Sequence, residues 1–118
     1  MLKQVQDLIK EAKSECKCLN AHDAKEFYEV TPGTTIIDVR EPAEAEKAKL
    51  KQSINIPRGL LEMKITELCP DDDLPILLHC GAGGRASLCA RALQNMGYTN
   101  VHIIDAEFEE IQDAFSRP

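Results

Sequence analysis

Three short apolar segments, each too short to be a core helix, constrain the fold of this chain most strongly. They span residues 35–39, 75–79 and 101–104, and their apolar residues are nearly continuous rather than alternating with polar ones. Runs of this kind are typical of strands that are covered on both faces, as in parallel sheets.

Segments with helical periodicity separate these strands. We predict helices over 2–13, 20–30, 41–48, 60–68, 84–97 and 106–115, and a further brief strand over 53–56. Strands that alternate with helices form a parallel sheet with helices on both faces. The 118 residues fit one compact domain. The sequence therefore predicts a single α/β domain over residues 1–118 with a central parallel sheet.

The first predicted helix carries an apolar stripe. Leu2, Val5, Leu8, Ile9 and Ala12 recur at helical spacing, with Lys and Glu residues between them. We expect this stripe to pack on the rest of the domain rather than to bind a partner.

The chain is acidic, with 14 Lys and Arg against 20 Asp and Glu, and a formal net charge of −6. This balance argues against a nucleic-acid partner, because affinity for phosphates comes from clustered Lys and Arg. The first residues lack the apolar core of a signal peptide, and no apolar run approaches the roughly 18 residues of a membrane span. We therefore expect a soluble, cytoplasmic protein with no membrane partner.

Five cysteines, an odd number, cannot all be paired. In a reducing compartment cysteines are more often catalytic, metal-binding or simply buried than disulfide-bonded. Cys80 differs from the other four because it lies between a predicted buried strand and a predicted helix, at the start of a glycine-rich segment. That segment reads Cys80, Gly81, Ala82, Gly83, Gly84, Arg85.

This segment has the features of an anion-binding loop. Glycines permit tight backbone conformations and leave the backbone N–H groups uncovered. A helix start carries partial positive charge, and Arg85 adds a fixed guanidinium. Both features favour the thiolate form of a neighbouring cysteine. We interpret Cys80 as a nucleophile and residues Gly81 to Arg85 as the group that holds an anion on its sulfur.

The order strand, Cys-x-x-Gly-x-Arg, helix resembles the active-site loop of the single-domain rhodanese-like sulfurtransferase family. Residues 38–42 read Asp-Val-Arg-Glu-Pro and residues 54–57 read Ile-Asn-Ile-Pro, and both are similar to segments of that family. The resemblance runs from about residue 20 to 115, so residues 1–18 are expected to form an N-terminal helical extension packed on the family-like core over 20–115.

The resemblance implies a function. Cys80 would take a sulfane sulfur from a small anionic donor such as thiosulfate, or from a protein persulfide, and hold it as a persulfide. The sulfur would then pass to a thiol or to a cyanide-like acceptor. No cofactor and no metal ion are expected.

Three alternatives remain open at this point. The first is a sulfur-carrier or regulatory module that keeps the fold without turnover. The second is a cysteine-dependent phosphatase, although such enzymes place five residues between Cys and Arg, and this chain has four between Cys80 and Arg85. The third is a redox-sensing thiol protein in which Cys69 or Cys89 pairs with Cys80.

The sequence departs from the family pattern at three places. Lys49 stands where members often have His, Ala86 where they often have Ser, and residues 105–107 read Asp-Ala-Glu instead of a glycine-containing turn. We hypothesise that Asp105 and Glu107 make the site less welcoming to a dianion such as thiosulfate. A persulfide would then be the physiological donor.

The other polar candidates have structural interpretations. Asp38 and Arg40 end a strand at the functional edge, where by resemblance we expect a buried, hydrogen-bonded scaffold, and Arg58 is expected near the mouth of the site, where it could attract an anionic donor. Strand alternation turns His79 away from Cys80, and His102 lies in a core strand, so both are expected to be packed residues.

The remaining cysteines offer weaker functions. Cys16, Cys18 and His22 provide three potential metal ligands, but structural zinc needs four, and no second Cys pair is present. Cys89 falls within a predicted helix and Cys69 within a predicted loop, and both are expected to be buried and unreactive.

Overall fold

A computed structural model describes residues 1–118. Its five strands form one parallel sheet in the order β1-β5-β4-β2-β3. The elements are α1 (Val5–Glu15), β1 (Lys17–Leu19), α2 (Ala21–Val30), β2 (Thr35–Asp38), α3 (Pro42–Lys47), β3 (Ser53–Asn55), the 3₁₀ helix η1 (Arg58–Leu60), α4 (Leu61–Leu68), β4 (Ile76–His79), α5 (Gly84–Met96), β5 (Val101–Ile104) and α6 (Phe108–Ser116).

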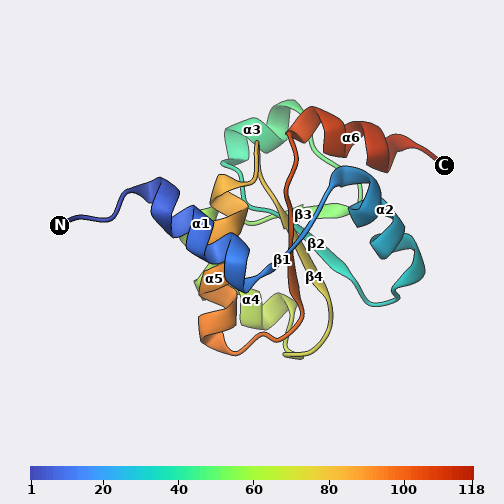
Figure 1. The fold of residues 1–118 in the computed structure, drawn as a ribbon. Coiled ribbons are helices and arrows are strands. Elements are labelled where there is room, and N and C mark those ends of the chain that lie inside the picture. The colour runs from blue at the N-terminus through green and yellow to red at the C-terminus, as the bar shows by residue number, and fades with distance from the viewer.

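Helices cover both faces of the sheet, as the sequence predicts (Figure 1). The central strands β2, β4 and β5 send alternate side chains into two apolar clusters. Ile37 and Leu78 belong to the cluster that includes side chains of α4 and α5, and Ile36 and Leu77 to the cluster that includes side chains of α2 and α6. Burial on both faces explains why these strands are continuously apolar.

Strand β1 was not predicted. It is three residues long and pairs with β5 at the edge of the sheet, with Lys17 opposite His102 and Leu19 opposite Ile104. Two of its three residues are exposed, so its sequence lacks the apolar run that identifies the central strands. The division into an extension over 1–18 and a core over 20–115 stays a prediction, although the pairing of β1 places Lys17 and Cys18 within the sheet.

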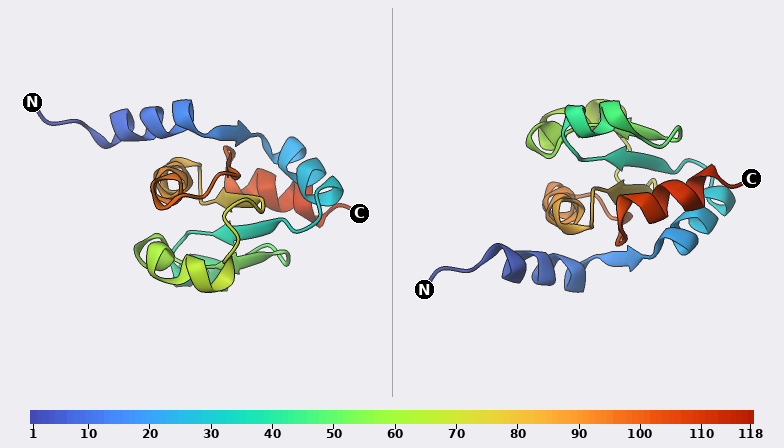
Figure 2. Two further views of the ribbon diagram at one scale, coloured as in Figure 1. Left: turned by 90° about the horizontal axis from the view of Figure 1, so that it is seen from below. Right: turned by 90° about the horizontal axis from the view of Figure 1, so that it is seen from above.

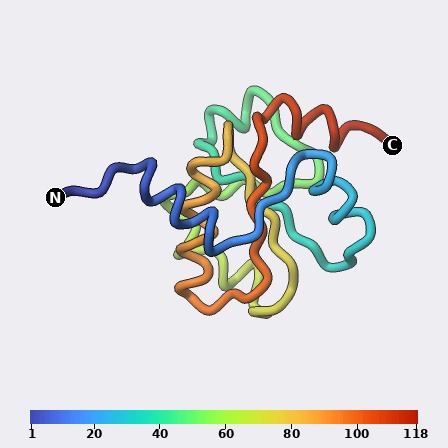
Figure 3. The backbone as a smooth tube through the Cα atoms, viewed as in Figure 1, coloured from blue at the N-terminus to red at the C-terminus, as the bar shows by residue number.

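Helix α1 packs on the domain with only part of its predicted stripe. Ala12 is fully buried, and the Gln94 side chain of α5 donates a hydrogen bond to the Glu15 carbonyl (3.0 Å). Leu2, Val5 and Leu8 remain exposed, and the N-terminal end of the chain projects away from the body of the domain (Figure 3). The expected packing is therefore correct for Ile9 and Ala12 and wrong for the first three residues of the stripe.

The chain ends lie at opposite sides of the molecule, with α1 leading away on one side and α6 on the other (Figure 2). No helix is long and apolar enough to cross a membrane. The loops after β2, β4 and β5 follow the carboxyl ends of parallel strands, so they all lie at the same end of the strands. In open α/β sheets, ligands bind beyond the carboxyl ends of the strands.

Candidate active site

Cys80 is the first residue after β4, and its sulfur is enclosed by the turn that leads into α5. The side chain is 1% exposed. The backbone N–H of Gly83 donates to Sγ at 3.1 Å, and that of Ala86 donates at 3.4 Å. The N–H groups of the first turn of a helix have no partner within the helix, so the sulfur takes the place of a capping group.

Ala86 was not among the predicted loop residues. The predicted donors were residues 81–85, whereas the donors observed on Sγ are Gly83 and Ala86. The signal that could have found Ala86 is its place as the third residue of α5, because the first residues of a helix all have free N–H groups.

Gly83 is required by the shape of this turn. Its φ is +99°, a left-handed conformation that L residues rarely adopt. A Cβ atom at this position would lie 2.7 Å from Asp105 Oδ1. The carbonyl of Gly83 accepts hydrogen bonds from the backbone N–H and the hydroxyl of Ser87, at 2.9 and 2.6 Å. Both backbone groups of Gly83 are therefore hydrogen-bonded, the N–H to Cys80 Sγ and the carbonyl to Ser87.

Arg85 belongs to the same loop, but its guanidinium is bound by a carboxylate. Nη1 and Nη2 donate to the two carboxylate oxygens of Glu44 in α3, at 2.6 and 3.1 Å. Glu44 was not among the predicted site residues, and it lies 41 positions before Arg85. The hydrogen bond from Arg85 is the first cause that lowers the pKa of Glu44 to about 2.

Asp38 and Arg40 form the buried pair that the resemblance suggested. Arg40 Nε and Nη2 donate to the Asp38 carboxylate at 3.0 and 2.9 Å, and Nη2 also donates to the Ala48 carbonyl at 2.7 Å. The guanidinium lies 3.9 Å from the ring centroid of Phe108. One buried cation thereby connects the ends of β2, α3 and the start of α6. The pair does not contact Cys80.

The turn before α6 packs against the loop that follows Cys80. The Phe108 N–H donates to the Gly81 carbonyl at 2.9 Å. Asp105 is paired with Lys13 of α1 (3.1 Å), so its charge is partly neutralised by a contact that the sequence did not predict. Glu107 is exposed and begins α6 as its N-cap. Of the two carboxylates predicted to discourage a dianion, Glu107 is thus the one without an ionic partner.

A cavity of about 440 Å³ lies between η1, α4 and α5, beside Arg85. Its lining includes Arg58, Glu62, Arg85 and Cys89. Arg58 is exposed, and its side chain makes no hydrogen bond or ion pair. Arg58 and Arg85 thus line the same cavity, and Cys80 is not among its lining residues.

Cys89 lies in α5 with 3% of its surface exposed. Burial, the largest cause, raises the pKa of this thiol to about 12, and nearby Arg58 opposes the rise. Cys69 is the C-cap of α4, and burial, the largest cause, raises the pKa of its thiol, while nearby Thr35 at the start of β2 opposes the rise. Thr35 is at the amino end of β2 and Cys80 follows the carboxyl end of β4, so Cys69 and Cys80 lie at opposite ends of the parallel strands.

Two further groups have positions that agree with structural roles. His79 stacks on Phe108 with ring centroids 5.9 Å apart, on the face of the sheet opposite to Cys80, and burial lowers its pKa. Lys49, in place of the family His, donates to the carbonyls of Leu50 and Ser53 at 3.0 and 2.7 Å.

Cys16 is buried and Cys18 exposed. His22 is exposed on α2, and no three His, Cys, Asp or Glu side chains are grouped as metal ligands.

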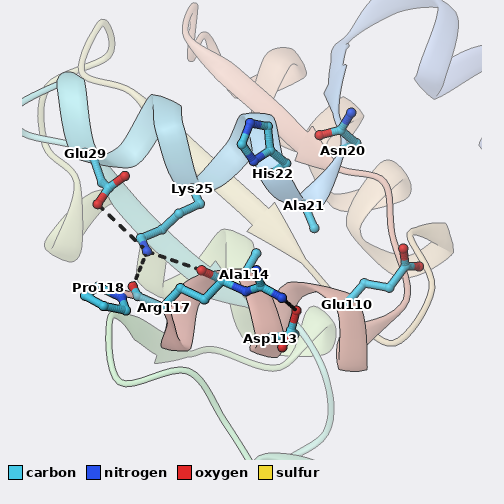
Figure 4. A pocket seen from close by; sticks show the side chains of 10 residues that line it. All are labelled: Asn20, Ala21, His22, Lys25, Glu29, Glu110, Asp113, Ala114, Arg117 and Pro118. Carbon is cyan, nitrogen blue, oxygen red and sulfur yellow. Dashed lines mark hydrogen bonds and ion pairs between the residues drawn. The ribbon is translucent and has the colours of Figure 1, made fainter.

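The largest cavity, about 680 Å³, lies elsewhere, between α2 and α6 (Figure 4). Lys25 crosses it, donating to the Ala114 and Arg117 carbonyls at 3.2 and 2.6 Å and pairing with Glu29. Lys25 is therefore paired with Glu29 and Arg117 with Asp113, and Cys80 is not among the lining residues.

The site is thus a buried cysteine sulfur held by backbone N–H groups at a helix start, at the carboxyl edge of a parallel sheet. The rhodanese-like domain model matches residues 20–114, and the chain belongs to this family.

Two curated relatives carry names from sulfur chemistry. "Putative sulfur carrier protein YrkF" of Bacillus subtilis is 36% identical over 66 residues, which are 56% of this chain and 35% of that protein. "tRNA sulfurtransferase" of Shewanella halifaxensis is 42% identical over 72 residues, which are 58% of this chain and 14% of that protein. The chain thus spans about a third or less of the length of these two relatives.

A solved structure from Rhodopseudomonas palustris, described as a protein of unknown function and "Possible Tyrosine Phosphatase", superposes with a TM-score of 0.87 at 27% identity. It covers 100% of this chain, and the chain covers 95% of it. The fold of the whole chain, including α1, is therefore found in another protein.

Proposed function

We propose that the chain is a sulfurtransferase that moves a sulfane sulfur through a persulfide on Cys80. The observation that supports this most directly is the pair of backbone N–H groups on Sγ at the start of α5. These donors favour a thiolate before the reaction and a negatively charged sulfur after it. Membership of the rhodanese-like family and the names of the sulfur-handling relatives support the same chemistry.

The proposed reaction has two steps. The Cys80 thiolate attacks the outer sulfur of thiosulfate, the S–S bond of thiosulfate breaks, and sulfite leaves with the bonding electrons. With an organic persulfide as donor, the leaving group is the organic thiolate. The acceptor, a thiolate or cyanide, then attacks the outer sulfur of the Cys80 persulfide and restores the Cys80 thiolate.

We assign the loop residues Gly81, Ala82, Gly83 and Gly84, with Arg85, to the binding of the persulfide. Arg58 is proposed to attract an anionic donor, because its guanidinium is unpaired at the adjacent cavity. Asp38 and Arg40 are proposed to support the edge of the site through their buried pair.

Two other functions have a specific observation in their favour. A carrier without turnover agrees with the 1% exposure of Cys80 and with the name of the Bacillus relative. A phosphatase agrees with the description of the Rhodopseudomonas structure. The four residues between Cys80 and Arg85 favour sulfur transfer over phosphate chemistry, since the shorter loop suits a single sulfur atom.

The test combines intact mass spectrometry with turnover. Wild-type protein and Cys80→Ala are incubated with thiosulfate, and cyanide is then added. Gain of one sulfur atom in the wild type only, with steady thiocyanate release, supports the proposal. A stable adduct without turnover supports the carrier, and hydrolysis of p-nitrophenyl phosphate without an adduct supports the phosphatase.

A further inference from the structure

The guanidinium of Arg85 is the one side-chain cation of the catalytic loop, and it is already occupied. Both of its terminal nitrogens donate to Glu44, one to each carboxylate oxygen, at 2.6 and 3.1 Å. This bidentate arrangement is the geometry by which arginine also binds oxyanions. An oxyanion that approached these two nitrogens would have to displace Glu44.

The position of Glu44 is fixed independently of Arg85. Its Oε1 accepts a hydrogen bond from the backbone N–H of Glu41 at 3.0 Å, which caps the start of α3. The Glu44 pKa of about 2 keeps its carboxylate ionised at neutral pH. The pair therefore places a negative charge beside the loop and cancels the positive charge of Arg85.

The consequence differs between donors. Thiosulfate is a dianion and releases sulfite, also a dianion, whereas a simple organic persulfide is a monoanion and releases a monoanionic thiolate. The persulfide needs only the backbone donors on Cys80 Sγ, but an oxyanion group needs a cation or further donors to offset its second charge. With Arg85 paired to Glu44, the charges without an ionic partner at the adjacent cavity are the cation of Arg58 and the two carboxylates of Glu41 and Glu62. Their sum is negative, which is the wrong sign to offset a second negative charge on the donor.

We propose that Glu44 determines donor specificity: by occupying Arg85 it disfavours dianionic thiosulfate and leaves the loop selective for monoanionic persulfides. This inference rests on the sulfurtransferase function proposed above. Glu44 acts through Arg85 and is a positioning residue, since it does not contact the reacting sulfur. Specificity of this kind is built by repelling the competing ligand rather than by new contacts to the preferred one.

The experiment measures sulfur loading of the full chain by intact mass, without acceptor, at rising donor concentration. The donors are thiosulfate and the persulfide of 2-mercaptoethanol, which has no other charged group. Glu44→Gln keeps an oxygen for the Glu41 N–H but removes the charge, and Glu44→Asp keeps the charge on a shorter side chain. The matched control is Glu46→Gln, which removes one charge from the same helix at an exposed residue without an ionic partner.

We expect E44Q to raise the second-order rate constant for thiosulfate about tenfold, equivalent to about 1.4 kcal/mol. The rise should come from a lower thiosulfate concentration at half-saturation, and the rate of loading by the persulfide should be unchanged. E44D should give a smaller rise, and E46Q should match the wild type with both donors. A merely structural role for Glu44 would instead lower both rates together.

An unchanged or lowered thiosulfate rate in folded E44Q overturns the inference while leaving the proposed function intact. If E44Q does not fold, E44D takes its place, and an unchanged or lowered thiosulfate rate in E44D overturns the inference in the same way. Absence of a sulfur adduct on the wild type with both donors overturns the proposed function, and the inference with it.

Discussion

Cys80 and Cys89 are two buried thiols of the same apolar cluster, with 1% and 3% of their surfaces exposed, yet their surroundings differ. Two backbone N–H groups donate to Cys80 Sγ, whereas no hydrogen-bond donor contacts the sulfur of Cys89, whose pKa is about 12. Burial alone keeps a thiol protonated and unreactive. We therefore propose that position at the start of a helix, and not burial, separates the candidate nucleophile from the packing residue.

The largest expected effect comes from substituting Cys80, with a substitution of Cys89 as the comparison. Cys80→Ser should lower thiocyanate formation by more than about 10³-fold, because the hydroxyl is a far weaker nucleophile at neutral pH. Cys89→Ala should retain the activity, since Cys89 is assigned only to packing. Steady-state thiocyanate assays on both variants test the contrast. Equal losses in the two variants would contradict it.

Glycines at the two ends of α5 offer a matched pair of lesser effect. Gly83 and Gly97 have φ values of +99° and +110°, so Ala at Gly97 should cost about 1–2 kcal/mol of unfolding free energy, and Ala at Gly83 should cost more because its Cβ would also lie 2.7 Å from Asp105 Oδ1. Only Gly83→Ala should also lower sulfur transfer, by about 100-fold, because the added Cβ and the strained φ would displace the backbone N–H at position 83 from the Cys80 sulfur. At Gly97 nothing lies within 4 Å of an added Cβ.

Urea unfolding and thiocyanate assays on both glycine variants separate the cost of strain from the displacement of the donor. Equal activity in folded Gly83→Ala and Gly97→Ala would contradict the expectation that sulfur transfer depends on the exact position of the Gly83 N–H.

The raised pKa of Cys89 predicts a pH dependence of stability. The folded-state pKa of about 12 lies above the ordinary value of 9.0, so the folded state holds this proton more tightly. The stabilisation is complete below about pH 9 and is lost as the pH rises towards 12. Between these limits wild-type stability should fall up to about 1.4 kcal/mol per pH unit more steeply than that of Cys89→Ala.

Urea midpoints at several pH values above 9 measure this difference. Parallel pH profiles for the wild type and Cys89→Ala would mean that Cys89 is solvated enough to ionise in the folded protein.

The smallest expected effect concerns Glu107 at the turn before α6. Its exposed charge is unpaired, and Glu107→Gln should lower the KM for thiosulfate by about twofold, because exposed charges contribute little through solvent. Glu109→Gln, an exposed change in the first turn of the same helix, is the control. An unchanged KM in Glu107→Gln, or an equal shift in both variants, would remove Glu107 from donor selection.

Most of the fold follows from patterns that are local in the sequence. The strands β2, β4 and β5 were predicted within one residue at either end, because burial on both faces leaves a continuous apolar run. Strand β1 was missed because its formation depends on pairing with β5, a contact that the exposed residues Lys17 and Cys18 do not signal.

The candidate site was predictable where it is made by backbone and unpredictable where it is made by distant side chains. The glycine-rich turn after a buried strand indicated Cys80 and the Gly83 donor, whereas the Ala86 donor was missed. The pairing of Arg85 with Glu44, and of Asp105 with Lys13, joins residues far apart in the chain. Such pairs depend on how the elements are arranged in space, and the charges at the site differ from the predicted ones for that reason.

The most direct measurement is to locate the sulfur on wild-type protein loaded with 2-mercaptoethanol persulfide. The loaded protein is alkylated and digested, and each of the five cysteines is identified by peptide mass spectrometry. We expect one added sulfur at Cys80 and none at Cys89. Sulfur at Cys89 or another cysteine, with Cys80 unmodified, would contradict the assignment of Cys80 as the nucleophile.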